Sequence, residues 1–304
     1  MKLRIITGRA GAGKSKLVLE TIAAQRFERQ QILLVPEHAT HEAELDLCRA
    51  LGDTASRDGE VLSFQSLATR VLSQTGGISD ITLDNGGKIL IMRRALQEVS
   101  SYLTVFSKPS QRPAFLRELV ALADELYAYK IAPSLLLQQV QDIPGAAGDK
   151  LRSTALLFGA YDARLHGGDF DARSKVQKLC DKLPNSDYLC GKDIYIDGFS
   201  YFNRTEEDII AAALKQANSV TVTLLGDDSD PQLFRNGIQQ RERLRRLAKD
   251  AGCSCEVENL VRNSDTAFSH LERYFLGAEK AWTGSTPPIT LYQANTAYSE
   301  VEYV

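Results

Sequence analysis

A glycine-rich segment near the start of the chain constrains the fold more than any other feature. It reads, in order, Gly8-Arg9-Ala10-Gly11-Ala12-Gly13-Lys14-Ser15. An apolar run precedes it at 3–7, and a pattern with helical period follows it at 16–22. A strand, a glycine-rich loop and a helix in this order form a phosphate-binding loop. The sequence therefore predicts an α/β fold with such a loop at the end of its first strand.

The residue types of this segment suit phosphate binding. Glycines lack a Cβ atom, so the loop can pass close to a phosphate and direct its backbone N–H groups inward. The start of the following helix adds unpaired N–H groups and partial positive charge. We expect Lys14 to reach the β- and γ-phosphates of ATP and Ser15 to ligate Mg²⁺. The predicted nucleotide-binding residues are Gly8, Arg9, Ala10, Gly11, Ala12, Gly13, Lys14 and Ser15.

A magnesium site of this kind also needs a carboxylate at the end of a neighbouring buried strand. Asp197 is the best candidate, because it closes the apolar run 194–196 and strand ends share one edge of a parallel sheet. It could instead cap the following turn, and Asp227 and Asp228 compete for the same role after another strand. The next residue, Gly198, has no side chain to position a water, so we predict no catalytic residue for hydrolysis.

Composition and charge limit the remaining possibilities. The 304 residues are 43% hydrophobic and 25% charged, as expected for a globular chain, and the net charge of −3 gives no general attraction to nucleic acid or acidic lipid. No apolar run is long enough to cross a membrane, and the first predicted strand starts at Leu3, where a signal peptide would stand. We therefore expect a cytoplasmic protein with no membrane partner.

The five cysteines, an odd number, are expected to be reduced thiols. Two close pairs, Cys180 with Cys190 and Cys253 with Cys255, raise the alternative of metal binding. The spacing typical of zinc sites is absent and no histidine lies near either pair. Buried structural cysteines are the better interpretation.

Strand-like runs alternate with helical patterns at both ends of the chain, which predicts an open, mostly parallel sheet. These runs are 3–7, 31–36, 61–64, 193–199, 219–225 and a short one at 255–257. Between the third and fourth runs, residues with helical period continue without a convincing strand. We therefore predict one α/β domain made of residues 1–84 and 185–304, with a helical insertion at 85–184.

Capping residues mark two of the helix starts. Asp84 precedes a helical pattern that runs to about Ser100, and Thr205 precedes three acidic residues. Acidic side chains in a first turn favour the helix dipole. Glu206 and Glu207 are therefore expected to stabilise a helix start and not to position a water.

The order of these motifs resembles the first RecA-like domain of a superfamily 1 helicase of the UvrD/RecB type. The resemblance is strongest to the AddB family, the second subunits of bacterial AddAB helicase–nucleases, which are called RexB in some bacteria. Beyond the glycine-rich segment, it rests on Leu34-Val35-Pro36-Glu37-His38-Ala39-Thr40, Ser63-Phe64-Gln65-Ser66-Leu67-Ala68, Ile194-Tyr195-Ile196-Asp197-Gly198-Phe199 and Glu300-Val301-Glu302. The Asp-Gly-Phe element resembles that family's degenerate form of the D-E-x-x box.

The resemblance implies a P-loop RecA-like fold and a subunit of an ATP-dependent helicase/deoxyribonuclease. Such a subunit works with an AddA-type subunit on single- and double-stranded DNA ends, recognises a Chi sequence and serves homologous recombination. Family members carry an iron–sulfur cluster in a C-terminal nuclease domain, and none of the five cysteines here matches its positions. We expect this chain to be the N-terminal part of a protein several times longer, without nuclease or efficient ATPase activity of its own.

Two departures from helicase motifs favour a domain that is not a motor. No glutamine precedes the loop to read adenine, and the G-D-x-x-Q element lacks its glutamine, since it reads Gly226-Asp227-Asp228-Ser229-Asp230. Two other functions stay open. A small-molecule or nucleoside kinase could also combine a phosphate loop with a helical lid, although no arginine-rich lid motif is present. A nucleotide-binding scaffold without turnover is the other.

Candidate DNA contacts have two interpretations each. Phe64 could stack on a base or lie in the core at a strand end. The cluster Arg241, Arg243, Arg245 and Arg246 could form a basic patch or a solvated helix face.

Overall fold

A computed structural model describes residues 2–26, 28–52, 55–77, 83–106, 112–140, 143–166, 174–261, 267–274, 281–285 and 290–304. The chain divides into two compact units, Met1–Leu260 and Val261–Val304. The first unit holds the sheet and most of the helices.

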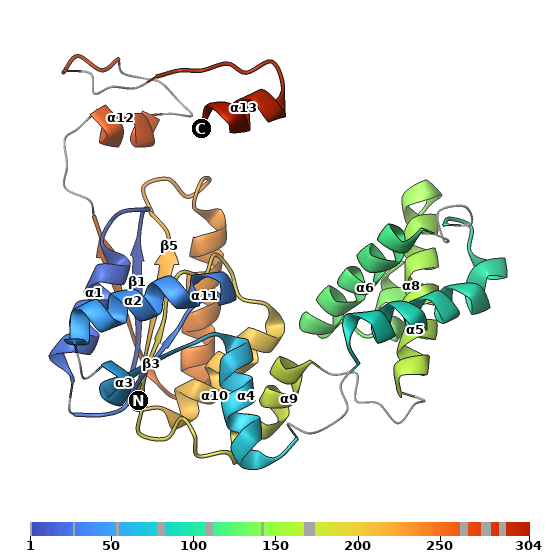
Figure 1. The fold of residues 1–304 in the computed structure, drawn as a ribbon, viewed down its shortest axis with the longest axis horizontal. Helices are drawn as coiled ribbons and strands as arrows, with labels where there is room; N and C mark the ends of the chain where they lie inside the picture. Colours follow the sequence, from blue (N-terminus) through green and yellow to red (C-terminus); the bar gives the residue numbers. More distant parts are fainter. Residues whose placement is uncertain are drawn as a thin grey trace. The chain divides into compact units, whose positions relative to one another are not determined.

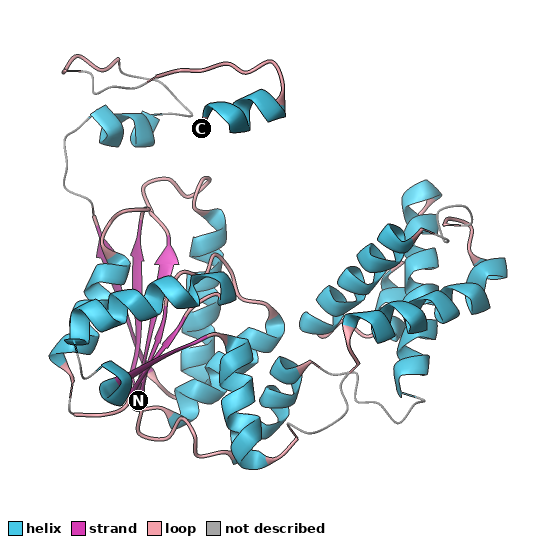
Figure 2. Cartoon of the chain, viewed as in Figure 1, coloured by secondary structure: helices cyan, strands magenta, loops and turns pink. Residues whose placement is uncertain are grey.

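The described residues of the first unit form one parallel sheet of six strands (Figure 2). The strand order is β3-β2-β4-β5-β1-β6. The strands are β1 (Lys2–Gly8), β2 (Gln31–Leu34), β3 (Gly59–Leu62), β4 (Asp193–Ile196), β5 (Ser219–Leu225) and β6 (Ser254–Leu260). The predicted α/β fold with a mostly parallel sheet is confirmed, and the sheet is parallel throughout.

Helices cover both faces of the sheet, which explains the continuous apolar runs of the central strands (Figure 1). The helices α1 (Lys14–Ala24) and α2 (Thr40–Leu51) pack on one face, in a core that includes Ile6, Leu33 and Tyr195. The other face packs against α4 (Phe64–Thr75), α9 (Lys175–Lys182), α10 (Arg204–Gln216) and α11 (Arg235–Asp250). Each face buries about half of the strand side chains, as alternation along a strand requires.

The stretch between α4 and α9 is helical. It contains α5 (Asn85–Val99), α6 (Pro113–Ala128), α7 (Pro133–Gln139) and α8 (Gly145–His166). A separate core joins α5, α6 and α8 through Leu96, Leu119 and Tyr161, among others. None of the described residues in this stretch belongs to the sheet, whereas α9 packs on α4 in the sheet core. The division into domains at 85–184 stays a prediction.

Capping explains where several helices start. The Asp84 carboxylate accepts from the Gly87 N–H at 2.7 Å, so the predicted cap of α5 is confirmed. The predicted cap Thr205 was wrong, because Asn203 occupies that position in a capping box with Glu206. Thr205 lies inside the first turn, and its hydroxyl donates to the Ala128 carbonyl at 2.9 Å, which ties α10 to the end of α6.

The predicted strand 61–64 is too long at its C-terminal end. Ser63 has extended backbone dihedrals, and its hydroxyl accepts from the Ser66 N–H at 3.1 Å. This cap starts α4 at Phe64, so a residue expected in a strand end becomes the first residue of a helix.

The cysteines are free thiols, but the prediction that both close pairs are buried was wrong for Cys190 and Cys255. Both are exposed, because Cys190 lies in the turn before β4 and Cys255 lies on the edge strand β6. Cys180 and Cys253 are half-buried and packed against the sheet core.

The second unit contains two short helices among its described residues, α12 (Ala267–Tyr274) and α13 (Ala297–Tyr303). Thr296 and Ser299 form a capping box at the start of α13. Across the described parts of both units, no helix combines the length and the apolar character needed to cross a membrane.

Candidate nucleotide-binding site

The predicted phosphate-binding loop joins β1 to α1. Gly11 and Gly13 have φ values of 70° and 88°, in the left-handed region that glycine adopts without strain. A Cβ atom on Gly8 would lie 2.7 Å from the Leu260 carbonyl oxygen of the neighbouring strand β6. Glycine is therefore required at Gly8 for strand packing and at Gly11 and Gly13 for the turn.

The N-terminus of α1 is open to an anion. Its N-cap is Gly13, no side chain in the described part of the chain caps it, and its first turn contains no acidic residue. Ser15 is exposed in that first turn. The unpaired N–H groups and the partial positive charge of the helix therefore have no competing internal partner from a side chain.

Lys14 is folded back onto the loop. Its Nζ donates to the carbonyl oxygens of Gly8 at 2.9 Å and Arg9 at 2.8 Å. Burial lowers the pKa of Lys14, and the charge of the nearby Asp197 carboxylate partly offsets this. A half-buried ammonium held only by carbonyl groups can exchange them for a more strongly attracting phosphate oxygen.

The structure brings Asp197 close to this lysine, although β5 lies between β4 and β1 in the sheet. The Asp197 N–H donates to the Leu34 carbonyl at 2.9 Å, which fixes the residue at the end of β4. The Thr223 hydroxyl of β5 donates to the Asp197 carboxylate. A half-buried carboxylate held by a hydroxyl and facing an ammonium keeps lone pairs for the water shell of a metal ion.

The competing aspartates are engaged by arginines. Asp227 accepts from the Arg9 Nε at 2.6 Å, and from the Ser229 N–H and hydroxyl at 2.8 and 2.7 Å. Burial alone would raise the pKa of Asp227, but the hydrogen bonds from Arg9 and Ser229 outweigh it and hold the pKa at about 2. Asp228 pairs with Arg241 at 2.9 Å.

The Arg9 guanidinium also lies 5.2 Å from the centre of the Phe234 ring. Arg9 therefore fastens the phosphate-binding loop to the segment after β5. This cation is directed at a carboxylate and a ring of the chain itself.

Gly198 stands where a helicase would carry a water-positioning glutamate. Its φ is 81°, and an added Cβ would lie 3.4 Å from the Pro36 Cδ. The next carboxylates are committed elsewhere, since Glu206 closes the capping box of α10 and Glu207 pairs with Arg204 and Arg243 at 3.4 Å each. The structure thus shows three carboxylates near the loop in structural roles and Asp197 beside the lysine.

Sequence comparison assigns the chain to a family. The family model described as ADDB, N-terminal, matches residues 5–272. The chain belongs to the ADDB N-terminal family. This family membership agrees with the resemblance found in the order of the motifs.

Relatives of this ADDB N-terminal chain are named as the B subunit of an ATP-dependent helicase/deoxyribonuclease. The protein of Clostridioides difficile (strain 630) is 31% identical over 329 residues, which cover 100% of this chain. That of Desulforamulus reducens is 32% identical over 325 residues and 99% of this chain. That of Geobacillus thermodenitrificans is 30% identical over 328 residues and 100% of this chain. The chain spans 28% of the length of each of these relatives.

The candidate DNA contacts of the ADDB N-terminal chain lie in different settings. Phe64 is 5% exposed and packs in the sheet core, with its ring centre 5.3 Å from that of Phe199. Arg241, Arg243 and Arg245 form ion pairs with acidic residues of the chain. The core interpretation of Phe64 and the solvated-face interpretation of the arginines therefore have the structural support.

Two parts of the site were missed in the sequence of this ADDB N-terminal chain. Thr223 was counted only as a strand residue, although a threonine in an otherwise apolar strand is a signal for a polar partner. The Arg9–Asp227 pair joins residues 218 positions apart, so no local pattern could reveal it.

Proposed function

We propose that this chain is the ATP-binding N-terminal region of the B subunit of an ATP-dependent helicase/deoxyribonuclease. In this proposal ATP·Mg²⁺ binds to Gly8, Arg9, Ala10, Gly11, Ala12, Gly13, Lys14 and Ser15, with Asp197 on the metal side. The observation that carries the proposal is the meeting of Lys14 and Asp197 beside the open start of α1. The names and the family of the relatives support the assignment to the B subunit.

Each residue of the proposed site has a defined task. The N–H groups of the loop and of the first turn of α1 bind phosphate oxygens, and Lys14 gives up its two carbonyl partners to do the same. The Ser15 hydroxyl ligates Mg²⁺, and Asp197 binds the water shell of the ion. Bound Mg²⁺ neutralises negative charge on the phosphates.

The proposed site binds ATP without efficient turnover. Hydrolysis needs a positioned water and a cation on the transferring phosphoryl group. Gly198 has no side chain for the first task, and Glu206 and Glu207 are held in α10. Arg9, the arginine of the loop, is paired with Asp227. This is the basis for proposing a domain that is not a motor.

The proposal extends to partners and location. The relatives are named as one subunit of a helicase/deoxyribonuclease, which supports a second, AddA-type subunit and action on single- and double-stranded DNA ends in the cytoplasm. Recognition of Chi and a role in homologous recombination follow from the family resemblance. The iron–sulfur cluster of that family is assigned to its nuclease domain and to none of the five cysteines here.

Calorimetric titration with ATP and Mg²⁺, combined with steady-state phosphate release, tests the proposal. Saturable binding with phosphate release close to background is the expected result. Steady release near one per second would show that another residue supplies the missing water contact. Transfer of phosphate to an added nucleoside would favour the kinase, and no measurable affinity would favour a scaffold with a vestigial loop.

A further inference from the structure

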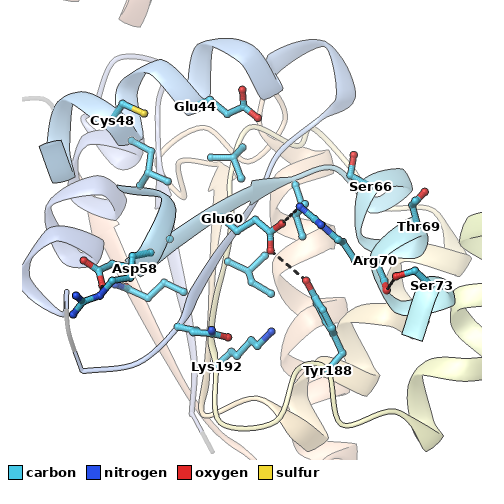
Figure 3. A pocket seen from close by; sticks show the side chains of 18 of the residues that line it. Glu44, Cys48, Asp58, Glu60, Ser66, Thr69, Arg70, Ser73, Tyr188 and Lys192 are labelled. Carbon is cyan, nitrogen blue, oxygen red and sulfur yellow. Dashed lines mark hydrogen bonds and ion pairs between the residues drawn. The ribbon is translucent and has the colours of Figure 1, made fainter. Parts of the chain in front are cut away.

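The β3 edge of the sheet carries a groove that the proposed nucleotide site does not use (Figure 3). Its volume is about 1000 Å³. Residues of α2 line it from one face of the sheet, residues of α4 from the other, and β3 runs between them. Three strands separate β3 from the β1 strand of the phosphate-binding loop, so the groove is a distinct region of the first unit.

The outer side of β3 offers main-chain hydrogen-bonding groups. In the pairing with β2, the Leu62 carbonyl accepts from the Val35 N–H at 3.0 Å. Backbone groups of successive strand residues point in opposite directions within the sheet, so those of Val61 point away from β2. Within the described residues, neither the N–H nor the C=O of Val61 has a hydrogen-bond partner. β3 is therefore an open template for another strand.

Both borders of the groove carry polar side chains. Glu44 and Cys48 lie on the α2 side, and Ser66, Thr69 and Ser73 lie on the α4 side (Figure 3). An extended chain presents its side chains alternately to two sides. Helices on both sides of β3 can therefore contact both sets of side chains of a bound strand.

Lys192 places a cation at one end of the groove (Figure 3). Its Nζ lies 3.8 Å from the centre of the Tyr188 ring, and no carboxylate of the described residues forms an ion pair with it. Burial lowers the pKa of Lys192, although the charges of Glu60 and Asp187 partly offset this. A partly desolvated ammonium without an ion-pair partner favours an incoming anion.

The carboxylate nearest to this lysine along the groove is already committed. Glu60 pairs with the Arg70 guanidinium at 2.7 Å and accepts from the Tyr188 hydroxyl at 3.2 Å (Figure 3). These contacts hold Glu60 and Tyr188 in place and leave Lys192 available.

We propose that the β3 groove binds an extended polypeptide strand of a partner protein, with an acidic side chain of that strand paired to Lys192. The bound strand adds to the sheet through the main chain of Val61. In such recognition the main-chain hydrogen bonds supply affinity, and contacts to alternate side chains supply specificity. The inference concerns a partner site and does not depend on nucleotide binding.

The first experiment selects ligands for the groove. A phage-displayed library of random peptides is selected on the full 304-residue chain and counter-selected on its Lys192→Glu variant. Enriched peptides are expected to carry Asp or Glu within an alternating, β-branched sequence. Their affinity is expected to fall about tenfold in Lys192→Met, which keeps the apolar stem. Arg49→Met, which removes an exposed cation of α2 outside the groove, serves as the matched control.

The second experiment tests the main-chain pairing. The enriched peptide is synthesised with N-methyl groups at one alternate set of positions or at the other. One set is expected to abolish binding and the other to preserve it, because only one set of N–H groups faces β3. Amide hydrogen exchange of Val61 is expected to slow on binding. Val257, whose backbone points outward at the opposite edge on β6, is the control amide.

Several results overturn the proposal. One is that no enriched peptide distinguishes the wild type from Lys192→Glu, and another is that both N-methylated sets bind equally. Light scattering that shows a dimer with a protected Val61 amide and no added peptide would assign the groove to a second copy. If circular dichroism shows that a Lys192 variant is unfolded, the N-methylation and exchange experiments decide, since both use the wild type.

Discussion

The ends of β4 and β5 are similar in sequence and different in the structure. Each strand is apolar and buried and is followed by an aspartate, Asp197 in one case and Asp227 in the other. Asp197 accepts from the Thr223 hydroxyl and lies near Lys14. Asp227 is held by the Arg9 guanidinium and by two groups of Ser229.

This difference separates a carboxylate suited to a metal ion from one that organises a loop. A metal-side carboxylate needs free lone pairs and a place beside the phosphate site. Asp227 uses its oxygens to fasten the loop through Arg9, so its charge is already neutralised within the chain. The neighbours of an aspartate decide its role, and its place at a strand end does not.

The largest expected effect is on the lysine that both ends surround. Lys14→Ala should lower the affinity for ATP·Mg²⁺ on the order of 100-fold, because it removes the only side-chain cation proposed to touch the phosphates. Isothermal titration calorimetry measures this. The matched control is Lys16→Ala, whose side chain is 80% exposed and pairs with Glu20. Equal losses in both variants would contradict the proposed site.

The two aspartates should respond differently to neutralisation. Asp197→Asn should weaken the magnesium-dependent part of nucleotide affinity about tenfold, as loss of an outer-shell ligand does. Asp227→Asn should change it much less, because its contacts serve the loop and not the metal. ATP titrations over a series of Mg²⁺ concentrations compare the two variants. A larger effect of Asp227→Asn would reverse the assignment made here.

Restoring a glutamate after Asp197 should not restore hydrolysis. In Gly198→Glu the backbone keeps a φ of 81° that a side chain tolerates poorly, and the new Cβ meets Pro36. Unfolding by urea should show a loss of about 1–2 kcal/mol, with phosphate release unchanged. Gly198→Asn, with a residue that adopts this region more readily, is the control and should lose less. A marked gain in phosphate release by Gly198→Glu would show that the position can serve catalysis.

The smallest expected effect concerns the loop anchor at β5. Asp227→Asn should lower the free energy of unfolding at neutral pH by about 1 kcal/mol, since it keeps a hydrogen-bonding oxygen for Ser229 and loses the charge facing Arg9. The control Asp228→Asn removes a more exposed carboxylate, 64% accessible, and should cost less.

The pH dependence of this effect has a defined sign. The pKa of Asp227 is about 2 in the folded chain, below the ordinary value near 3.9 of an unfolded chain. A lowered folded-state pKa means that the stabilisation is present above about pH 4 and is lost as the pH falls toward 2. Denaturant unfolding of wild type and Asp227→Asn at several pH values should show the difference shrinking on acidification. A difference that grows toward low pH would contradict the ion pair.

Much of the site was predictable from local sequence. The strand, loop and helix around Gly13 and Lys14 follow from neighbouring residues, and so does the choice of a glycine after Asp197. The cap of α5 at Asp84 was predicted for the same reason. Thr205 was predicted as a cap and Asn203 is the cap, because both residue types suit that position and only backbone geometry separates them.

What the sequence by itself determined is the presence of a phosphate-binding loop, the α/β alternation and the helical character of the stretch after α4. These depend on interactions between residues close along the chain. Only the tertiary structure decided between Asp197 and Asp227, paired Arg9 with a residue far along the chain, and left the edge of β3 open beside Lys192. The reason is physical: strand order and the meeting of distant charges arise when the sheet assembles, and no local pattern of residues encodes them.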